Sequence, residues 1–420
     1  MPIGKSGPAE TAIVIGGGII GLSSALHLAI KGLRVTIVDP QFPCRAASWG
    51  NAGHIAVEQV EPLASMAVVR SLPKRLFPAG PVALPLRDID TWLPFTLKLV
   101  RAAAPDRFAR GKRALGALLV EALPAWQRLA DTASAGDLVV ADGHYVVWES
   151  PATARDGRAA WEAADKGTTH IRDLTADERA GLAALLGRDP AGAARFEGTA
   201  RIADPDLLAE ALDAAFAALG GERHTAAVRR IASDQASVVL DDGSILSADC
   251  LVLAAGVASR DLLAPLGHKA PLIAERGYHI QSAASDWPAD FPPVVFEDRS
   301  MIVTRFRSGI RAAGFVEFAR SASPPDPRKW DRLEAHIDAL GLPFDRPRAR
   351  WMGARPTLPD YLPAIGRSRR VPNLFYAFGH QHLGLTLAPA TGEAIAALVT
   401  GDAPALDLSP FDIARFEGHA

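Results

Sequence analysis

The stretch TAIVIGGGIIGL, at residues 11–22, decides the fold of this chain. Residues 12–15 are a short apolar run, which is typical of a buried parallel strand. Gly16, Gly18 and Gly21 follow in the spacing GxGxxG, and the apolar residues 19–31 predict a helix directly after them. The glycines therefore fall in the turn between a strand and a helix, where this spacing indicates a dinucleotide-binding loop.

The residues after this helix complete a βαβ unit. Residues 34–39 predict a second strand, which ends with Asp39 and Pro40. In such a unit Gly18 lets the backbone approach a pyrophosphate at the positive end of the helix. A carboxylate at the position of Asp39 accepts hydrogen bonds from ribose hydroxyls and repels a 2′-phosphate; the alternative is that Asp39 only starts a turn with Pro40. Both NAD and FAD fit these residues.

Composition argues against several classes of protein. The 420 residues carry a formal net charge of -2, which gives no reason to expect a nucleic-acid partner. Cys44 and Cys250 lie far apart in the sequence, so we expect two reduced thiols in a cytoplasmic protein, without a metal site. No uninterrupted apolar run reaches the roughly 20 residues of a membrane-spanning helix, and the polar first residues do not predict a signal peptide.

Regular signals return in the second half of the chain. Asp204 and Pro205 predict the start of a helix, and residues 250–255 predict a buried strand after a β-hairpin. Seven prolines between residues 56 and 115 predict short helices and loops, and a last helix is expected from about Pro389. This order of elements looks like the two-part FAD domain of flavoprotein oxidoreductases.

Four further segments make the resemblance specific. They are ASWGNAGH at residues 47–54, VLAAG at 252–256, MGARPTLPD at 352–360 and FGHQHLGLT at 378–386. Together with the glycine loop and Asp39, they resemble the D-amino acid dehydrogenase and glycine oxidase superfamily, the broad group of D-amino acid oxidase-like flavoproteins. The resemblance extends over nearly the whole chain.

The resemblance implies the fold and its division into domains. It implies an α/β fold, in which a Rossmann-type FAD-binding domain carries an inserted α+β substrate domain with a mixed sheet. The FAD-binding domain is expected to be discontinuous, at residues 1–55, 200–265 and 350–420. The substrate-binding domain is expected at residues 56–199 and 266–349.

The resemblance also implies which residues contact FAD. Small and polar residues after residue 46 suit a backbone that passes beside the pyrophosphate and the flavin ring. Amides at the start of the last helix suit the negative charge of a reduced flavin. The FAD contacts are expected at Gly16, Gly18, Ile19, Ile20, Gly21, Asp39, Pro40, Ala47, Ser48, Asn51, Ala52, Gly53, Val228, Ala255, Gly256, Gly379, His380, Leu383, Gly384, Leu385 and Thr386.

Four residues are candidates for the catalytic site. Arg355 matches the family arginine that binds the substrate carboxylate through two parallel hydrogen bonds; its alternative is a surface ion pair with Asp360. Strand alternation places Tyr278 on the same face as Arg276, where it is expected to reach a carboxylate beside Arg355; the alternative is an edge-strand ion pair between Glu275 and Arg276. His54 and His382 are expected near the flavin, and either His380 or His382 faces its ring.

By this resemblance the chain oxidises a D-amino acid by hydride transfer to flavin N5. The resulting imine hydrolyses to a 2-oxo acid, and the electrons pass to an acceptor other than NAD, either a quinone or an electron-transfer partner. D-Proline and hydroxy-D-proline are candidate substrates. The alternatives are an oxygen-dependent oxidase of glycine or N-methyl amino acids and a catalytically silent FAD-binding subunit of an electron-transfer complex, such as a hydroxyproline dehydrogenase.

The Pro-rich segment around residues 92–97 bears on localisation. Its sequence WLPFTL suits either peripheral contact with the inner face of a membrane or ordinary packing in the core. The sequence alone leaves these two interpretations open.

Overall fold

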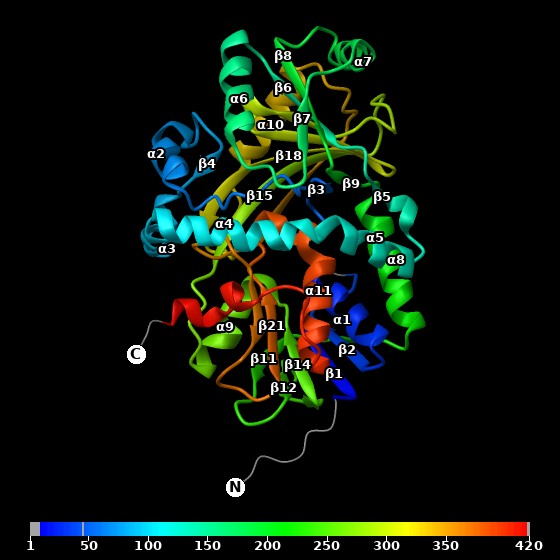
Figure 1. Cartoon of the computed structure of the whole chain (residues 1–420), viewed down its shortest axis with the longest axis vertical. Helices are drawn as coiled ribbons and strands as arrows, with labels where there is room; N and C mark the ends of the chain where they lie inside the picture. Colours follow the sequence, from blue (N-terminus) through cyan, green and yellow to red (C-terminus); the bar gives the residue numbers. More distant parts are fainter. Residues whose placement is uncertain (1–8, 44–45, 418–420) are drawn as a thin grey trace.

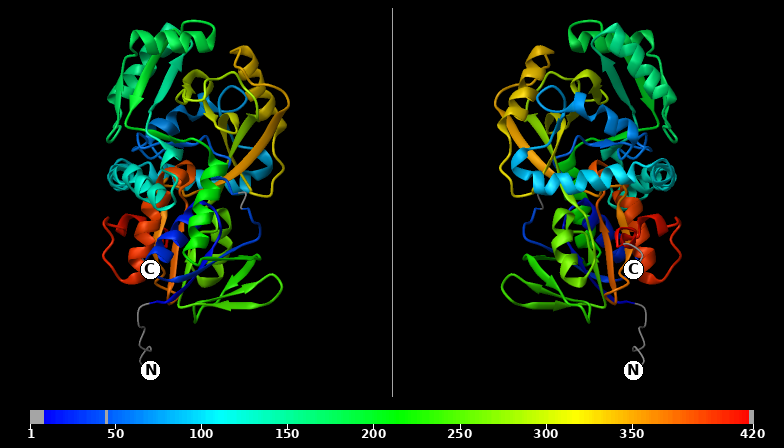
Figure 2. Two further views of the ribbon diagram at one scale, coloured as in Figure 1. Left: turned by 90° about the vertical axis from the view of Figure 1, so that its right-hand side faces the viewer. Right: turned by 90° about the vertical axis from the view of Figure 1, so that its left-hand side faces the viewer.

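Two large sheets, one above the other, organise the chain in this computed structural model (Figures 1 and 2). It describes residues 9–43 and 46–417, so the predicted reduced thiol of Cys44 lies outside the described residues. Cys250 is a free, buried cysteine, and burial raises the pKa of its thiol to about 12. This thiol therefore stays protonated at neutral pH and is a poor nucleophile.

The lower sheet contains the predicted βαβ unit. Its strand order is β10-β2-β1-β14-β21-β20, and all neighbours are parallel except β20 and β21. The strands are β1 (Thr11–Ile15), β2 (Arg34–Asp39), β10 (Glu222–Thr225), β14 (Cys250–Leu253), β20 (Ala364–Arg367) and β21 (Leu374–Phe378). The sheet combines strands from three distant parts of the chain. Because β1 pairs with β14, the glycine loop after β1 lies beside the end of β14.

Layers on both faces bury this sheet. Helices α1 (Ile19–Ile30), α8 (Pro205–Ala218) and α11 (Gly384–Thr400) cover one face. The other face is covered by α9 (Ser259–Leu263) and by a small sheet of β11 (Val228–Ile231), β12 (Ser237–Leu240) and β13 (Ile245–Ser247). The predicted start of α8 is confirmed, because the Asp204 carboxylate accepts hydrogen bonds from the backbone N–H groups of Asp206 and Leu207.

The last helix begins earlier than the sequence indicates. The expected start at Pro389 is wrong, because α11 begins at Gly384 and Pro389 lies inside it. A proline inside a helix cannot donate to the carbonyl four residues before it, here that of Leu385. Trp126 donates its indole N–H to this carbonyl at 2.9 Å instead, so the helix continues without an unpaired acceptor.

The upper sheet is mixed and has nine strands. Its order is β19-β15-β18-β17-β16-β6-β8-β7, and β4 also pairs with β18. The strands are β4 (Val82–Ala83), β6 (His144–Trp148), β7 (His170–Arg172), β8 (Gly192–Glu197), β15 (Ile273–Ser282), β16 (Val294–Phe296), β17 (Met301–Phe306), β18 (Gly309–Ala319) and β19 (Arg348–Thr357). Most of β19 lies in the range expected for the FAD domain, yet the strand belongs to this sheet because it pairs with β15 along its whole length.

The remaining elements join and flank the two sheets. β3 (His54–Ile55), β5 (Val139–Val140) and β9 (Ala200–Ile202) form a small antiparallel sheet between them. The other helices are α2 (Met66–Arg75), α3 (Ile89–Ala102), α4 (Pro105–Val120), α5 (Ala122–Thr132), α6 (Pro151–Ala163), α7 (Ala176–Leu186) and α10 (Pro327–Ala339). Helix α4 crosses the middle of the molecule in Figure 1. With 16 residues, α4 is longer than the expected short helices of the Pro-rich region.

One helical segment has the length and apolar character of a membrane span. It is Gln381–Thr400, with a mean hydropathy of 1.4. Most of this segment, 67%, is buried inside the protein, where α11 packs against α1. We therefore interpret it as a core helix.

Candidate functional site

The glycine loop makes a close turn at the start of α1. Gly16 has a φ of 107°, which favours glycine, and its N–H donates to the carbonyl of Val38 at 2.8 Å. A Cβ atom on Gly21 would lie 1.9 Å from the carbonyl oxygen of Gly16. Helix α1 thus packs on the loop more closely than any side chain permits.

Two buried helix N-termini fit the charged parts of FAD. Helix α1 begins after Gly18 and helix α11 begins after Leu383. Neither N-cap residue gives a side-chain hydrogen bond, and neither helix has an acidic residue in its first turn. Amides that no side chain caps are a ready site for a pyrophosphate at α1 and for the anionic edge of a reduced flavin at α11.

The expected contacts to the adenosine half lie around the start of α1. The Asp39 carboxylate ends β2 and accepts a hydrogen bond from the N–H of Gly17 at 2.8 Å. Val228 begins β11 two residues after Ala226, whose N–H donates to the carbonyl of Asp39. Pro40 is exposed. Ile19, Ile20, Ala255 and Gly256 complete this group at the ends of β1 and β14.

The loop at residues 47–54 is held by side chains of the upper sheet. Arg311 donates to the carbonyls of Trp49 and Asn51, and His279 Nδ1 donates to the carbonyl of Gly50 at 2.8 Å. Of the loop residues expected to contact FAD, Asn51 and Ala52 therefore have carbonyls held by the upper sheet, and Gly53 has its carbonyl held by Ile202 of β9; Ala47 and Ser48 precede this held part. Arg311 lies inside an ordinary strand, β18, and no sequence motif marks it.

The loop before α11 lies against the chain after His54. The hydroxyl of Thr386 accepts a hydrogen bond from the N–H of Ala56, and His382 Nε2 donates to the side-chain oxygen of Gln59 at 2.7 Å. Gly379, His380, Leu383, Gly384 and Leu385 lie on the same turn. The structure thus brings together the second group of expected FAD contacts.

Arg355 projects from β19 and is held by a buried carboxylate. Its Nη1 donates to Glu275 on the neighbouring strand β15 at 3.2 Å. The Glu275 side chain is 1% exposed, whereas that of Arg355 is 27% exposed. Nη2 lies over Gly277, where a Cβ would approach it to 2.3 Å. No described residue accepts a hydrogen bond from Nε or Nη2, so part of the guanidinium remains available to a carboxylate ligand.

The two ion pairs named as alternatives in this region do not form, because the register of β15 gives these arginines other partners. Arg355 pairs with Glu275 and not with Asp360, which binds Arg415 at 2.7 Å. Arg276 lies on the other face and pairs with Glu317 at 2.8 Å, not with Glu275.

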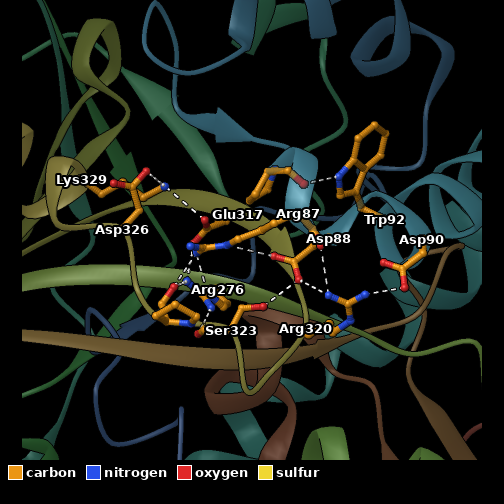
Figure 3. Close-up of polar contacts among 12 residues, drawn as sticks. Arg87, Asp88, Asp90, Trp92, Arg276, Glu317, Arg320, Ser323, Asp326 and Lys329 are labelled. Carbon is orange, nitrogen blue, oxygen red and sulfur yellow. Dashed lines mark hydrogen bonds and ion pairs between the residues drawn. The ribbon is translucent and has the colours of Figure 1, made fainter.

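The expectation that Tyr278 lies beside Arg355 is also corrected. Tyr278 is on the face of β15 opposite Glu275 and Arg355, and its hydroxyl donates to Glu317. Figure 3 shows Glu317 between Arg276 and Lys329, in a buried charge network away from the site.

Tyr361 is the tyrosine that the structure places beside Arg355. Its hydroxyl donates to the second oxygen of Glu275 at 3.1 Å, as does that of Thr357. Burial and the charge of Glu275 raise the pKa of the Tyr361 hydroxyl well above its usual value, so this group remains a donor. Tyr361 directly follows the segment that ends at Asp360, and this position is the sequence signal that marks it.

The histidines have different surroundings. His380 is buried and its Nε2 lies 3.0 Å from the Thr391 hydroxyl. His382 is near both Glu275 and Arg355, and burial lowers its pKa to about 4, so its ring is neutral at neutral pH. His382 is therefore the histidine on the side of the guanidinium.

His54 belongs to a compact polar cluster. Its Nε2 lies 3.0 Å from the buried carboxylate of Glu58, and its ring meets that of His144 edge to face. Ligand atoms of the three residues lie within 4.8 Å of one another, a spacing that a metal ion can use. Because His54 and Glu58 already pair directly, we interpret the cluster as an ion pair, and the absence of a metal site stays a prediction.

Glu58→Gln is expected to lower stability at neutral pH but not in acid. Burial alone would raise the pKa of Glu58, but the charge and hydrogen bond of His54 lower it to about 2. A lowered folded-state pKa contributes stability above the unfolded pKa, and this stability is lost as the pH falls through the folded value. The urea midpoint of the variant should lie below that of the wild type at neutral pH, and the gap should close between pH about 4.5 and about 2.

The exposed carboxylate Glu61 gives the control for this measurement. Glu61 pairs with Lys112 at 3.0 Å and is 41% exposed, so Glu61→Gln should change the midpoint little at any pH. If the difference in urea midpoint between Glu58→Gln and the wild type stayed constant with pH, the lowered pKa of Glu58 would be contradicted.

Comparisons with known proteins agree with this geometry. Residues 11–398 match the family described as DAO, FAD dependent oxidoreductase. The chain is 32% identical to a D-amino-acid oxidase of Bradyrhizobium diazoefficiens, over 96% of this chain and 98% of that protein. Its fold is similar to glycine oxidase from Geobacillus kaustophilus (TM-score 0.69, 23% identity, 98% and 99% of the two chains). It is also similar to L-proline dehydrogenase from P. horikoshii (TM-score 0.70, 18% identity, 98% of each chain).

Proposed function

Because the chain belongs to the DAO family of FAD-dependent oxidoreductases, we propose that it oxidises the amine of a D-amino acid and passes the electrons to an acceptor other than NAD. The position of Arg355 carries this proposal. Its guanidinium is partly exposed, is fixed by Glu275, and lies on the strand that leads to the loop before α11. Preference for the D configuration is supported by the curated relative, which is a D-amino-acid oxidase.

The residues around Arg355 suit the binding of a free amino acid. The guanidinium binds the substrate carboxylate, and Glu275, held by Thr357 and Tyr361, keeps it in place. His382 is neutral and adds no charge that would repel the amine. FAD, when bound, would accept the two electrons of the oxidation together with one hydrogen, as a hydride. The imine product then hydrolyses to a 2-oxo acid; ammonia is released from a primary amino acid, whereas a D-proline-type substrate keeps its nitrogen in the opened chain.

The long segment at residues 56–115 supports the dehydrogenase branch over an oxygen-dependent oxidase. This segment forms α2, α3 and most of α4. We take it as the feature that distinguishes the two branches. D-Proline and hydroxy-D-proline remain our candidate substrates, and a quinone or an electron-transfer partner remains our candidate acceptor.

Anaerobic reduction of the bound flavin tests this proposal. The holoprotein should bleach with D-proline or D-alanine and not with glycine or sarcosine, and the reduced form should reoxidise slowly in air but rapidly with a soluble quinone analogue. Bleaching by glycine or sarcosine followed by rapid reoxidation in air would favour the oxidase instead. A flavin that no amino acid bleaches would contradict any amine-oxidising role.

A further inference from the structure

Helix α3 presents a row of large apolar side chains to solvent. Among the described residues ten large hydrophobic side chains are exposed, and five of them lie between residues 86 and 100. They are spaced by three or four residues and so share one helical face. Their exposed fractions run from 39% to 81%, and they are Leu86, Ile89, Leu93, Leu97 and Val100. We call this row the α3 stripe.

The opposite face of α3 is firmly attached to the protein. Phe95 and Leu99 are buried in a cluster with Phe318 and Tyr361. The stripe is therefore the outer side of an anchored helix, and the inner side belongs to the apolar cluster that also contains Tyr361.

Polar contacts fix the start of the same helix. The buried carboxylate of Asp88 accepts hydrogen bonds from Arg320 at 3.0 Å and from the Ser323 hydroxyl at 2.7 Å (Figure 3). Trp92 donates its indole N–H to the carbonyl of Pro85. Leu86, Ile89 and their neighbours thus project from a backbone that is held in position.

Unpaired cations occur on the helix that carries the α3 stripe and on the helix that follows it. Lys98 and Arg101 of α3 and Arg107 and Arg110 of α4 are exposed, and no described carboxylate forms an ion pair with any of the four. All four line a groove between these helices and the end of the chain. Residues 86–113 contain seven basic and three acidic residues, although the whole chain has a net charge of -2. Positive charge is therefore concentrated next to the stripe.

We propose that the α3 stripe and its four cations dock the protein on an anionic lipid surface. A row of aliphatic side chains enters the boundary between headgroups and acyl chains, while neighbouring Lys and Arg side chains remain at the level of the phosphates. A protein partner fits less well, because a stable interface takes roughly 20–30 residues from each side and a single convex helix offers far fewer. The docked helix packs through its inner side into the apolar cluster that contains Tyr361.

Vesicle binding by the flavin-loaded full chain tests the proposal. The protein should sediment with vesicles of equal parts phosphatidylcholine and phosphatidylglycerol and not with phosphatidylcholine alone, and salt should weaken the binding. Leu93→Gln/Leu97→Gln should lower the partition coefficient about tenfold or more. Lys98→Gln/Arg101→Gln should lower it on anionic vesicles by a similar factor.

Matched substitutions elsewhere provide the controls. Leu219→Gln/Ile245→Gln removes two equally exposed apolar side chains from the lower part of the molecule and should leave binding unchanged. Arg155→Gln/Arg188→Gln removes two exposed charges from the upper part and should also leave it unchanged.

Three results would overturn the proposal. In the first, the wild type binds neither the anionic nor the phosphatidylcholine vesicles. In the second, the control variants lose as much binding as Leu93→Gln/Leu97→Gln. In the third, sedimentation velocity shows a dimer that Leu93→Gln/Leu97→Gln dissociates. Flavin bleaching by amino acids is measured in a separate assay without vesicles. If neither the wild type nor any variant bleached, the proposed function would be refuted, and the vesicle-binding result would still stand.

Discussion

Arg355→Lys is expected to slow flavin reduction by an amino acid at least about thirtyfold while the flavin stays bound. Lysine keeps the charge beside Glu275 but cannot offer two parallel donors to a carboxylate. Losing such a contact typically corresponds to about 2–5 kcal/mol, and each 1.4 kcal/mol is about tenfold. The measurement is anaerobic stopped-flow bleaching of the flavin at saturating and at low substrate.

A second arginine of similar burial provides the control for Arg355→Lys. Arg415 pairs with Asp360 at 2.7 Å and is 17% exposed. Arg415→Lys should leave the bleaching rate within about a factor of two, because its pair has no place in the proposed site. In the wild type, an amino acid should bleach the flavin much faster than the corresponding amine that lacks the carboxylate. Arg355→Lys should reduce the ratio of these two bleaching rates. An unchanged ratio would contradict carboxylate binding by Arg355.

Gly21→Ala is expected to yield a protein with less than about a tenth of the normal flavin. The added methyl would lie 1.9 Å from the carbonyl oxygen of Gly16, which is backbone and cannot rotate away. Relief of this overlap requires α1 to move off the loop, at a cost of about 1–3 kcal/mol or more, and the movement carries the amides of Ile19 and Ile20 away from the pyrophosphate. Flavin absorbance per chain in the soluble fraction measures the outcome.

A glycine in another helix provides the control for Gly21→Ala. It distinguishes the overlap at the glycine loop from a general effect of replacing a helical glycine with alanine. A Cβ on Gly181, in α7, would meet no atom closer than 3.9 Å. Gly181→Ala should therefore keep full flavin content, and its melting temperature should equal or exceed that of the wild type. In Gly21→Ala, added FAD should raise the melting temperature less than it does in the wild type. Normal flavin content in Gly21→Ala would contradict the close packing of α1.

Features set by neighbouring residues could be predicted from the sequence. The cap at Asp204 depends on contacts within three residues, and the glycine loop and the βαβ unit depend on contacts within the continuous stretch of residues 11–39. The alternation of β15 was also read correctly, with Glu275 and Arg276 on opposite faces. The family resemblance supplied the FAD cofactor and the fold, and the comparisons show both.

Partners from distant parts of the chain could not be predicted. Alternation says which way Glu275 points, but its pairing with Arg355 depends on the register between β15 and β19, which are 80 residues apart at that position. The same holds for Pro389, which sequence rules place at a helix start and which the indole of Trp126 permits inside α11. Arg311 carries no local signal at all, since its role exists only where two sheets meet.

The hydrogen bonds from Arg311 to the loop at residues 47–54 have a consequence for the binding of FAD. Gln281 binds the other edge of this guanidinium at 2.7 Å, so protein–protein contacts alone hold the backbone of the loop. A backbone ordered in advance loses little freedom when the ligand enters. FAD binding should accordingly need little rearrangement of this loop, because the loop already connects the lower sheet to the upper sheet.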